Sequence, residues 1–365
     1  MKIAFLVPGM DLGGVEQGTF DLACGFKELG HDVLVISGPG QYIPGLKETG
    51  IKWYPVPMER KTLPNFCRAL RRIRRIIAEE KPDILHCRSR FPAWIAYFAA
   101  KPFPESLFVT SVHGFHRSHW YSRIMGKGKR VIVVSEGLKD YAIRFLGASS
   151  EKVRVVYNGF GFTPFLNLSS PTKNKGDRLT VGAVGRLSKA KGYRYLIEAL
   201  GLLQKDFPNL KAILVGEGPE EKKLRVFTRR LSLEEKVSFV TGKSVDYLPS
   251  FDILAAPHIS PEPGPENGPY WPGRTAAEAQ VVGIPVVTTL QGLNPGTFES
   301  GAAEIFVPAK DPKGLAEGIR YLLTHPEEKL ALMERAKKSA LENFSLERMI
   351  TKTLEVYKEI FLQTH

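Results

Sequence analysis

The sequence predicts an α/β protein of two domains, each built around a parallel β-sheet. The chain has 365 residues, more than one hydrophobic core usually organises, and 43% of them are apolar. Short apolar runs alternate with helix-length amphipathic segments in the first half, and the same rhythm begins again in the second half. Such alternation is typical of βαβ units in a parallel sheet.

The first half is predicted to contain five strands, because five of its apolar runs are too short for helices. They lie at residues 3–7, 33–36, 84–86, 107–111 and 131–134. The amino-terminal run follows one lysine and ends at a Pro-Gly pair, which suits a buried first strand better than a signal peptide. No apolar run approaches the roughly 18 residues that cross a bilayer, so we expect a cytosolic protein.

The second half repeats the pattern. Strands are predicted at residues 179–184, 212–215, 237–240, 253–256 and 285–288, and helices between them at 193–205, 220–231 and 275–282. Residues 159–178 are rich in Gly, Pro, Ser and Asn and follow no period, which predicts a linker. Two helices are predicted from residue 326 onward, with a break at 343–345. Ligands of such sheets bind outside the carboxyl ends of the strands.

The positive charge is concentrated in the first half. Of the net +13, residues 1–165 contribute +10, with 24 Lys and Arg against 14 Asp and Glu. This excess predicts a polyanionic partner, such as acidic lipid, nucleic acid or a phosphorylated glycan. A nucleic-acid partner is disfavoured, because aromatic residues do not interleave with the arginines and no reading module is recognisable.

A basic amphipathic helix is predicted over residues 65–80. Its apolar face carries Phe66, Ile73 and Ile77, and arginines surround that face. Such a helix can rest on an anionic membrane. Any helix packed on a sheet has the same apolar face, however, so core packing with a solvated arginine face is the safer interpretation.

No metal centre or disulfide is predicted. The sequence has no Asp-x-Asp pair and no His, Asp or Glu cluster at metal-ligand spacing. Cys24, Cys67 and Cys87 match no zinc or haem spacing, lie among apolar neighbours, and are predicted to be buried free thiols.

Two glycine-containing loops follow predicted strands. Gly13 and Gly14 precede a helix, where backbone amides can approach an anion, although a tight turn explains the pair equally well. Gly185, Arg186 and Lys191 follow a strand and precede an amphipathic helix, so fixed helix dipoles and mobile charge are predicted to meet there. On charge alone, a solvated basic loop is the alternative.

Four segments resemble one enzyme family in order and spacing. They are LGGVEQGTFDLACGFKELGHDV, VGRLSKAKGYRYLIEAL, LVGEGPE and GRTAAEAQVVGIPVV. These segments are similar to those of the family-4 retaining glycosyltransferases of the GT-B fold. The segments PAWIAYFAA, TSVHGFH and RVIVVS resemble more narrowly the bacterial lipopolysaccharide-core and other cell-envelope members.

The resemblance implies two Rossmann-like domains whose parallel sheets face each other across a cleft. The amino-terminal acceptor domain is expected over residues 1–165, joined by the C-terminal helix at about 345–365. The nucleotide-sugar donor domain is expected over residues 166–344. The implied reaction moves a sugar to a cell-envelope glycan or lipid-linked acceptor, in the cytoplasm or at the inner membrane face, with no cofactor and no metal.

The resemblance also implies roles for individual residues. The catalytic residues are His113, which would face the donor sugar, and Arg186 and Lys191, which would bind the diphosphate. Glu278 matches the second glutamate of a paired motif and would accept from the ribose hydroxyls; an ordinary exposed helix residue is the alternative. The substrate-binding residues are expected to be Gly13, Gly14, Glu16, Gly185, Glu217, Gly273, Arg274, Thr275 and Glu278.

The sequence departs from the family where Tyr270 occupies the position of the first glutamate. Glu262 or Glu266, or the backbone amides of Gly273 and Arg274, are the possible replacements. A phosphate oxygen of the leaving nucleotide would then take the acceptor's proton, with retention of configuration. A sugar-nucleotide epimerase of the same fold and a non-catalytic sugar- or nucleotide-binding protein remain as alternatives.

Overall fold

A computed structural model describes residues 1–11, 13–115, 120–168, 179–259, 273–290, 299–300 and 303–362. The chain divides into two compact units: unit 1 is Met1–Phe160 with Leu346–His365, and unit 2 is Gly161–Ser345. Unit 2 begins at Gly161 rather than at residue 166, because the short helix α6 (Thr163–Leu166) packs against α10 (Gly273–Val282).

Unit 1 contains a parallel sheet whose seven described strands lie in the order β3-β2-β1-β4-β5-β6-β7. The strands are β1 (Lys2–Leu6), β2 (Asp32–Ser37), β3 (Lys52–Pro55), β4 (Ile84–Cys87), β5 (Leu107–Val112), β6 (Arg130–Val133) and β7 (Val153–Val155). The five predicted strands are confirmed. The edge strands β3 and β7 were not predicted, because they are short and only partly apolar.

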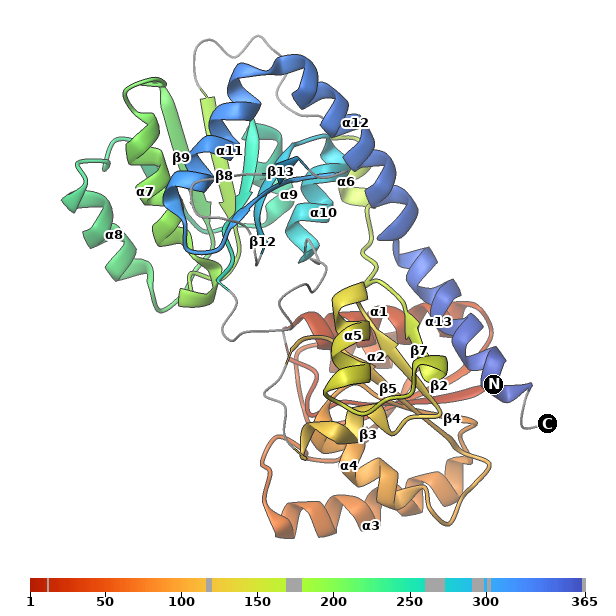
Figure 1. Ribbon diagram of the computed structural model, residues 1–365. Coiled ribbons are helices and arrows are strands. Elements are labelled where there is room, and N and C mark those ends of the chain that lie inside the picture. Colours follow the sequence, from red (N-terminus) through yellow and green to blue (C-terminus); the bar gives the residue numbers. More distant parts are fainter. Residues whose placement is uncertain are drawn as a thin grey trace. The chain divides into compact units, whose positions relative to one another are not determined.

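Helices cover both faces of the unit 1 sheet (Figure 1). Side chains of α1 (Gly14–Glu28), α2 (Ile43–Glu48) and α13 (Leu346–Phe361) join the core on one face. Side chains of α3 (Leu63–Glu80), α4 (Arg90–Ala99) and α5 (Glu136–Arg144) join it on the other. The last helix of the chain, α13, therefore belongs to unit 1, where it packs beside α1.

Helix α3 packs in the core through its apolar face. Ala69, Ile73, Ile76 and Ile77 are buried, whereas all five arginines between residues 68 and 75 are exposed. This arrangement matches the safer interpretation of the segment. The prediction for Cys67 was wrong: it lies on the exposed side of α3, whereas Cys87 is buried and Cys24 is half-buried.

Unit 2 contains a second sheet in the order β10-β9-β8-β11-β12-β14-β13. Its described strands are β8 (Leu179–Val184), β9 (Leu210–Val215), β10 (Val237–Val240), β11 (Ile253–Ala256), β12 (Val286–Leu290), β13 (Glu299–Ser300) and β14 (Ile305–Pro308). All pairs are parallel except β13 with β14. The five predicted strands are confirmed, while β13 and β14 were not predicted.

The helices of unit 2 complete a doubly wound α/β unit. They are α6, α7 (Tyr193–Leu203), α8 (Glu221–Arg230), α9 (Ser244–Tyr247), α10, α11 (Pro312–Thr324) and α12 (Pro326–Asn343). Helices α7, α8 and α11 share one core with the sheet, and α10 packs on β11, β12 and α12. The predicted break at 343–345 is confirmed, since α12 ends at Asn343 and α13 begins at Leu346.

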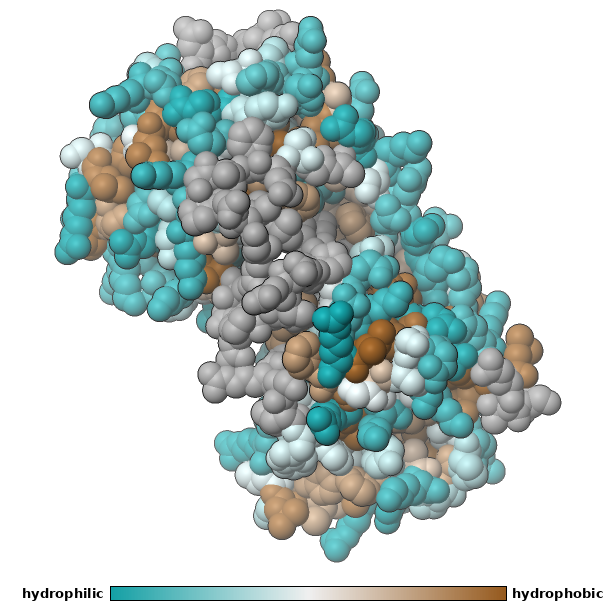
Figure 2. Space-filling view, in the orientation of Figure 1, coloured by the Kyte–Doolittle hydropathy of each residue, from teal (hydrophilic) through white to brown (hydrophobic). Residues whose placement is uncertain are grey.

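Both sheets have a point where the strand order reverses. In unit 1 this point lies between β1 and β4, and in unit 2 between β8 and β11. In open parallel sheets, ligands bind outside the carboxyl ends of the strands at such a point. The outer faces in view are mostly hydrophilic, with scattered hydrophobic residues (Figure 2). The segments that follow β1, β4, β8 and β11 are therefore the places to look for a site.

Candidate active site

The loop after β8 is held against the segment after β11. A short 3₁₀ turn, Lys189–Lys191, leads into Gly192, which has a left-handed conformation (φ 66°). A Cβ on Gly192 would lie 1.8 Å from the carbonyl oxygen of Pro257. Only glycine fits this backbone. Because Gly192 lies this close to Pro257, the turn brings Lys191 next to His258.

Lys191 and His258 form a half-buried pair at the strand-order reversal of unit 2. A hydrogen bond of 3.0 Å joins Lys191 Nζ and His258 Nε2. Burial, and secondly the charge of Lys191, lowers the pKa of His258 to about 3, so the imidazole is neutral and its Nε2 accepts the hydrogen bond from Lys191. Burial also lowers the pKa of Lys191. The histidine thus holds a cation in position without adding a second charge.

A small pocket opens beside this pair. It is lined by Lys191, Tyr193 and His258 on one side and by the first turn of α10, Gly273 to Ala276, on the other. The buried hydroxyl of Tyr193 has no hydrogen-bond partner among the described residues, and burial raises its pKa. A lysine, a free hydroxyl and a helix amino terminus together favour an anionic ligand, and a phosphate group fits this chemistry.

Glu278 of α10 is a buried carboxylate with two partners. Ser244 Oγ donates to Oε2 at 2.6 Å, and Arg274 Nε donates to Oε1 at 2.7 Å. Only 2% of Glu278 is exposed, which excludes the alternative of an ordinary exposed helix residue. Its role toward ribose stays a prediction. The chemistry permits this role, because a carboxylate retains lone pairs for further donors beyond these two.

Three predicted residues of unit 2 lie around this pocket rather than in its wall. Arg186 and the Glu217 side chain are exposed. The backbone of Glu217 is structural, because its carbonyl accepts from Leu187 N at 2.8 Å and so ties the loop after β9 to the loop after β8. Gly185 N donates to Val215 O at 2.9 Å and fixes the turn that precedes Arg186.

The predicted residues of unit 1 lie at the carboxyl ends of its strands. His113 follows β5, is half-buried, and shares a 2.8 Å hydrogen bond between its Nε2 and Ser111 Oγ. Gly13 and Gly14 are exposed at the start of α1. The Glu16 carboxylate curls back over Gly13, with Oε2 2.2 Å from where a Gly13 Cβ would lie. A negative group thus already sits at the positive end of α1.

The substitute for the first glutamate is not located. Tyr270, Glu262 and Glu266 lie outside the described residues. Among the residues that the structure describes, no three His, Cys, Asp or Glu side chains gather closely enough to hold a metal ion. None of the described helices is both long and apolar enough to cross a membrane.

Sequence reasoning missed His258, Tyr193 and Ser244. His258 follows β11 directly, as the predicted residues follow other strands, so its position was an available signal. Ser244 opens α9 after β10 in the same way. Their partners lie 67 and 34 residues away along the chain, which no local pattern reveals.

The two doubly wound units, each with a parallel sheet, define a protein of the GT-B fold. Residues 12–161 match the model for Glycosyltransferase Family 4, and residues 167–339 match that for Glycosyl transferases group 1. The chain belongs to the family-4 glycosyltransferases, which are retaining, metal-independent enzymes that use a nucleotide-sugar donor.

Similar proteins span the whole chain. An uncharacterized glycosyltransferase of Methanocaldococcus jannaschii is 26% identical over 98% of both chains. The crystal structure of a glycosyltransferase from Rickettsia africae is 27% identical, with a TM-score of 0.83, and covers 100% of this chain and 99% of its own. The Anabaena protein HepE, solved with UDP and glucose, is 22% identical, with a TM-score of 0.77, over 98% and 99%.

Proposed function

We propose that this glycosyltransferase transfers a sugar to an anionic cell-envelope acceptor, a glycan or lipid-linked saccharide, in lipopolysaccharide or polysaccharide biosynthesis. The observation that carries the acceptor class is charge. Unit 1 holds 27 Lys and Arg against 17 Asp and Glu, a net +10 of the chain's +13. A positive field of this size attracts polyanions and membranes rich in anionic lipid. The protein would then work in the cytoplasm, peripherally at the inner membrane face.

In this proposal, unit 2 binds the donor. Lys191, Arg186 and the amino terminus of α10 neutralise the diphosphate, while Glu278 accepts from the ribose hydroxyls. The support is the pocket between Lys191 and α10, and the burial of Glu278 next to it. UDP is the first donor nucleotide to test, because the Anabaena protein was solved with UDP and glucose. His113 and the Gly13–Gly14 turn belong to unit 1 and would act on the sugar and phosphate.

The first test is calorimetric titration with UDP, GDP and ADP. Glu278→Gln keeps the shape but loses the charge-assisted part of its hydrogen bonds, each worth about 1.5–3 kcal/mol, so nucleotide affinity should fall about tenfold or more. Ser244→Ala is the matched control, because it removes a partner of Glu278 and leaves the carboxylate. Equal affinity in Glu278→Gln and the wild type would show that the nucleotide is misplaced.

The acceptor class is tested separately by flotation with vesicles. Binding to vesicles that contain anionic lipid should exceed binding to zwitterionic vesicles, and added salt should weaken it, because screening acts over roughly 8 Å at physiological ionic strength. Arg71→Met and Arg72→Met, on the exposed side of α3, should reduce it. Binding that ignores both lipid charge and salt would contradict the peripheral location.

A further inference from the structure

Tyr193 has an unpartnered hydroxyl beside the pocket between Lys191 and α10, the lysine pocket. It is the first residue of α7, and only 3% of it is exposed. Its hydroxyl oxygen is buried and has no hydrogen-bond partner among the residues that the structure describes. A buried hydroxyl in this state has lost its hydration and gained nothing in return, which costs stability. A tyrosine rather than a phenylalanine here therefore needs an explanation outside the packing of unit 2.

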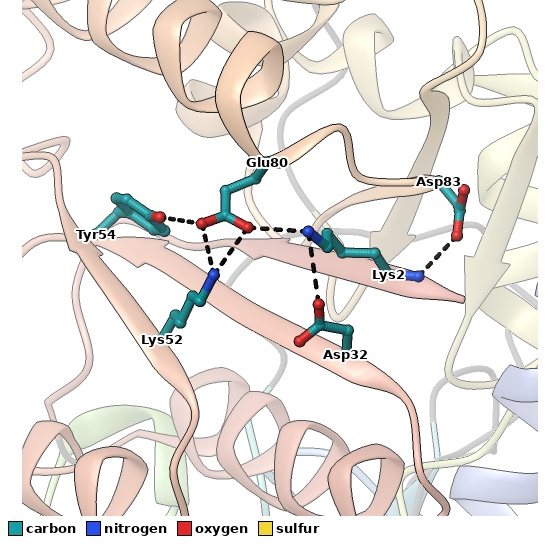
Figure 3. A network of polar contacts seen from close by, with 6 residues as sticks. All are labelled: Lys2, Asp32, Lys52, Tyr54, Glu80 and Asp83. Atoms are coloured by element: carbon teal, nitrogen blue, oxygen red, sulfur yellow. Dashed lines mark hydrogen bonds and ion pairs between the residues drawn. The ribbon is translucent and has the colours of Figure 1, made fainter.

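Two other tyrosines show the usual arrangement. The hydroxyl of the buried Tyr357 shares a hydrogen bond of 2.6 Å with His86 Nδ1. The half-buried Tyr54 donates to Glu80 at the amino edge of the unit 1 sheet (Figure 3). Both hydroxyls thus have a partner within the protein. The partner of the Tyr193 hydroxyl is to be sought in the pocket next to it.

A ligand has access to this hydroxyl, because Tyr193 lines the lysine pocket. The rim of the pocket reaches solvent, since Arg274 is exposed and Gly273 and Thr275 are half-buried. The pocket has a volume of about 40 Å³, which is room for about three water molecules. The peripheral oxygens of a single phosphoryl group fill a similar space, whereas a sugar ring or a nucleobase is too large. The size of the pocket therefore fits one phosphoryl group.

The Tyr193 hydroxyl and the Lys191 ammonium lie close to the same point above Gly185. A Cβ on Gly185 would be 3.1 Å from the Tyr193 oxygen and 3.7 Å from Lys191 Nζ. Gly185 has φ 140°, a conformation that favours glycine, so this point stays free of a side chain. Burial raises the pKa of Tyr193, so the hydroxyl keeps its proton at neutral pH. A cation and a neutral donor are thus within reach of one small anion.

The position of Glu278 indicates which phosphoryl group reaches the pocket. The pocket wall contains the first turn of α10, Gly273 to Ala276, whereas Glu278 lies in the next turn and outside the wall. With the ribose at Glu278, as proposed above, the phosphoryl group attached to the ribose lies nearer to Glu278. The terminal phosphoryl group of a nucleoside diphosphate is then the one that extends to Lys191 and Tyr193.

We propose that the Tyr193 hydroxyl donates a hydrogen bond to a terminal phosphoryl oxygen of the nucleoside diphosphate, an inference that rests on the donor site proposed above. When the bond between the sugar and this phosphoryl group breaks, its electron pair stays on the phosphoryl oxygen. The acceptor hydroxyl bonds to the sugar and releases its proton. Tyr193 thus donates to the group on which negative charge develops, and such a contact is stronger in the transition state than in the bound donor.

The test is calorimetric titration of Tyr193→Phe with UDP and UMP, or with the corresponding pair if the wild-type chain prefers GDP or ADP. The substitution removes only the hydroxyl. UDP affinity should fall about tenfold or more, because a hydrogen bond to a charged group is lost. UMP affinity should not change, because UMP has no terminal phosphoryl group beyond the one attached to the ribose. Tyr195→Phe is the matched control and should bind as the wild type does, since Tyr195 is a half-buried tyrosine of α7 outside the pocket wall.

Thermal unfolding of the same variants separates binding from packing. Without nucleotide, the Tm of Tyr193→Phe should equal or exceed that of the wild type, because an unpartnered buried hydroxyl is removed. At equal concentration, UDP should raise the Tm of Tyr193→Phe less than that of the wild type. A lower Tm without nucleotide, together with an unchanged UDP affinity, would mark a purely structural tyrosine and overturn the proposal.

The remaining outcomes distinguish this inference from the donor site on which it rests. Equal UDP affinity in Tyr193→Phe and the wild type would overturn the inference and leave the donor site standing. Equal losses for UDP and UMP would place the hydroxyl away from the terminal phosphoryl group and also overturn it. A wild-type chain that binds no UDP, GDP or ADP would overturn the donor site itself, and this inference with it.

Discussion

At the scale of single residues, the Lys191–His258 pair is the best-defined feature of the proposed donor site. A lysine alone in a pocket is a flexible charge, whereas a neutral acceptor at 3.0 Å restrains it. Because the cation is fixed before the ligand arrives, less conformational entropy is lost on binding.

We expect Lys191→Met to weaken binding of the nucleoside diphosphate by about 10- to 100-fold, because a charge-assisted contact to phosphate is lost. The fold should persist, since Met matches the length of the buried stem. Lys189→Met, on the exposed side of the same turn, is the control and should bind as the wild type does. Calorimetric titration checks both variants, and equal affinities would refute the role of Lys191.

Individual residues were predictable where the chain itself carries the signal. Lys191 and Glu278 stand in motifs next to a strand end or in a short buried helix, so position and resemblance together make them candidates. His258 also follows a strand directly, but its significance lies in what surrounds it. The lysine beside His258 comes from a segment distant in sequence, which only the folded chain brings next to it.

At the scale of elements, the turn from β8 into α7 is the most constrained part of the site. Gly192 combines a left-handed backbone with a close approach to the carbonyl oxygen of Pro257. The turn thus sets the distance between the loop after β8 and the segment after β11. The geometry of the lysine pocket therefore depends on this backbone contact.

Gly192→Ala should therefore damage both stability and binding. The left-handed conformation costs an alanine about 1–2 kcal/mol, and its Cβ must also push Pro257 away. We expect a lower Tm and weaker nucleotide binding, measured by thermal unfolding and calorimetry. Gly201→Ala, inside α7, is the control: its Cβ would meet only Leu233 at 3.7 Å, so the variant should be about 0.5–1 kcal/mol more stable.

Element prediction succeeded where burial is complete and failed at edges. Strands such as β8 and β11 are covered on both faces and read as continuous apolar runs, which the sequence displays. Strand β3 (KWYP) has two half-buried residues between two exposed ones, and β13 has two residues, so neither produces such a run. Their pairing comes from neighbouring strands rather than from their own composition.

At the scale of the whole molecule, the two units have separate cores. The clusters around β1 to β7 contain side chains of unit 1 only, and the cluster around β8 to β14 contains side chains of unit 2 only. Each unit also has a carboxyl with a shifted pKa, the half-buried Glu80 in unit 1 and the buried Glu304 in unit 2. Because the cores are independent, we expect two calorimetric unfolding transitions with different pH dependences.

Glu80 makes the stability of unit 1 depend on pH in the acid range. Hydrogen bonds, first from Lys52 and then from Tyr54, lower the pKa of Glu80 from 4.5 to about 2. A lowered pKa contributes stability that is present above about pH 4.5 and is lost as the pH falls through about 2. Glu80→Gln should flatten this acid dependence and lower the stability of unit 1 near neutral pH by about 1–2 kcal/mol, after allowing for solvent screening.

Glu304 gives unit 2 the opposite dependence. Burial raises its pKa from 4.5 to about 7, although Gln280 Nε2 donates to Oε1 at 2.7 Å and opposes the shift. A raised pKa of a carboxyl contributes stability that is complete below about pH 4.5 and is lost as the pH rises through about 7. Glu304→Gln should therefore remove the loss and stabilise unit 2 above pH 7 by about 1–3 kcal/mol.

Calorimetric scans of the wild type, Glu80→Gln and Glu304→Gln from acid to mildly alkaline pH separate the two effects. One transition that responds identically to both substitutions would contradict independent units, and an unchanged alkaline slope in Glu304→Gln would show that this carboxyl is ionised in the folded protein throughout.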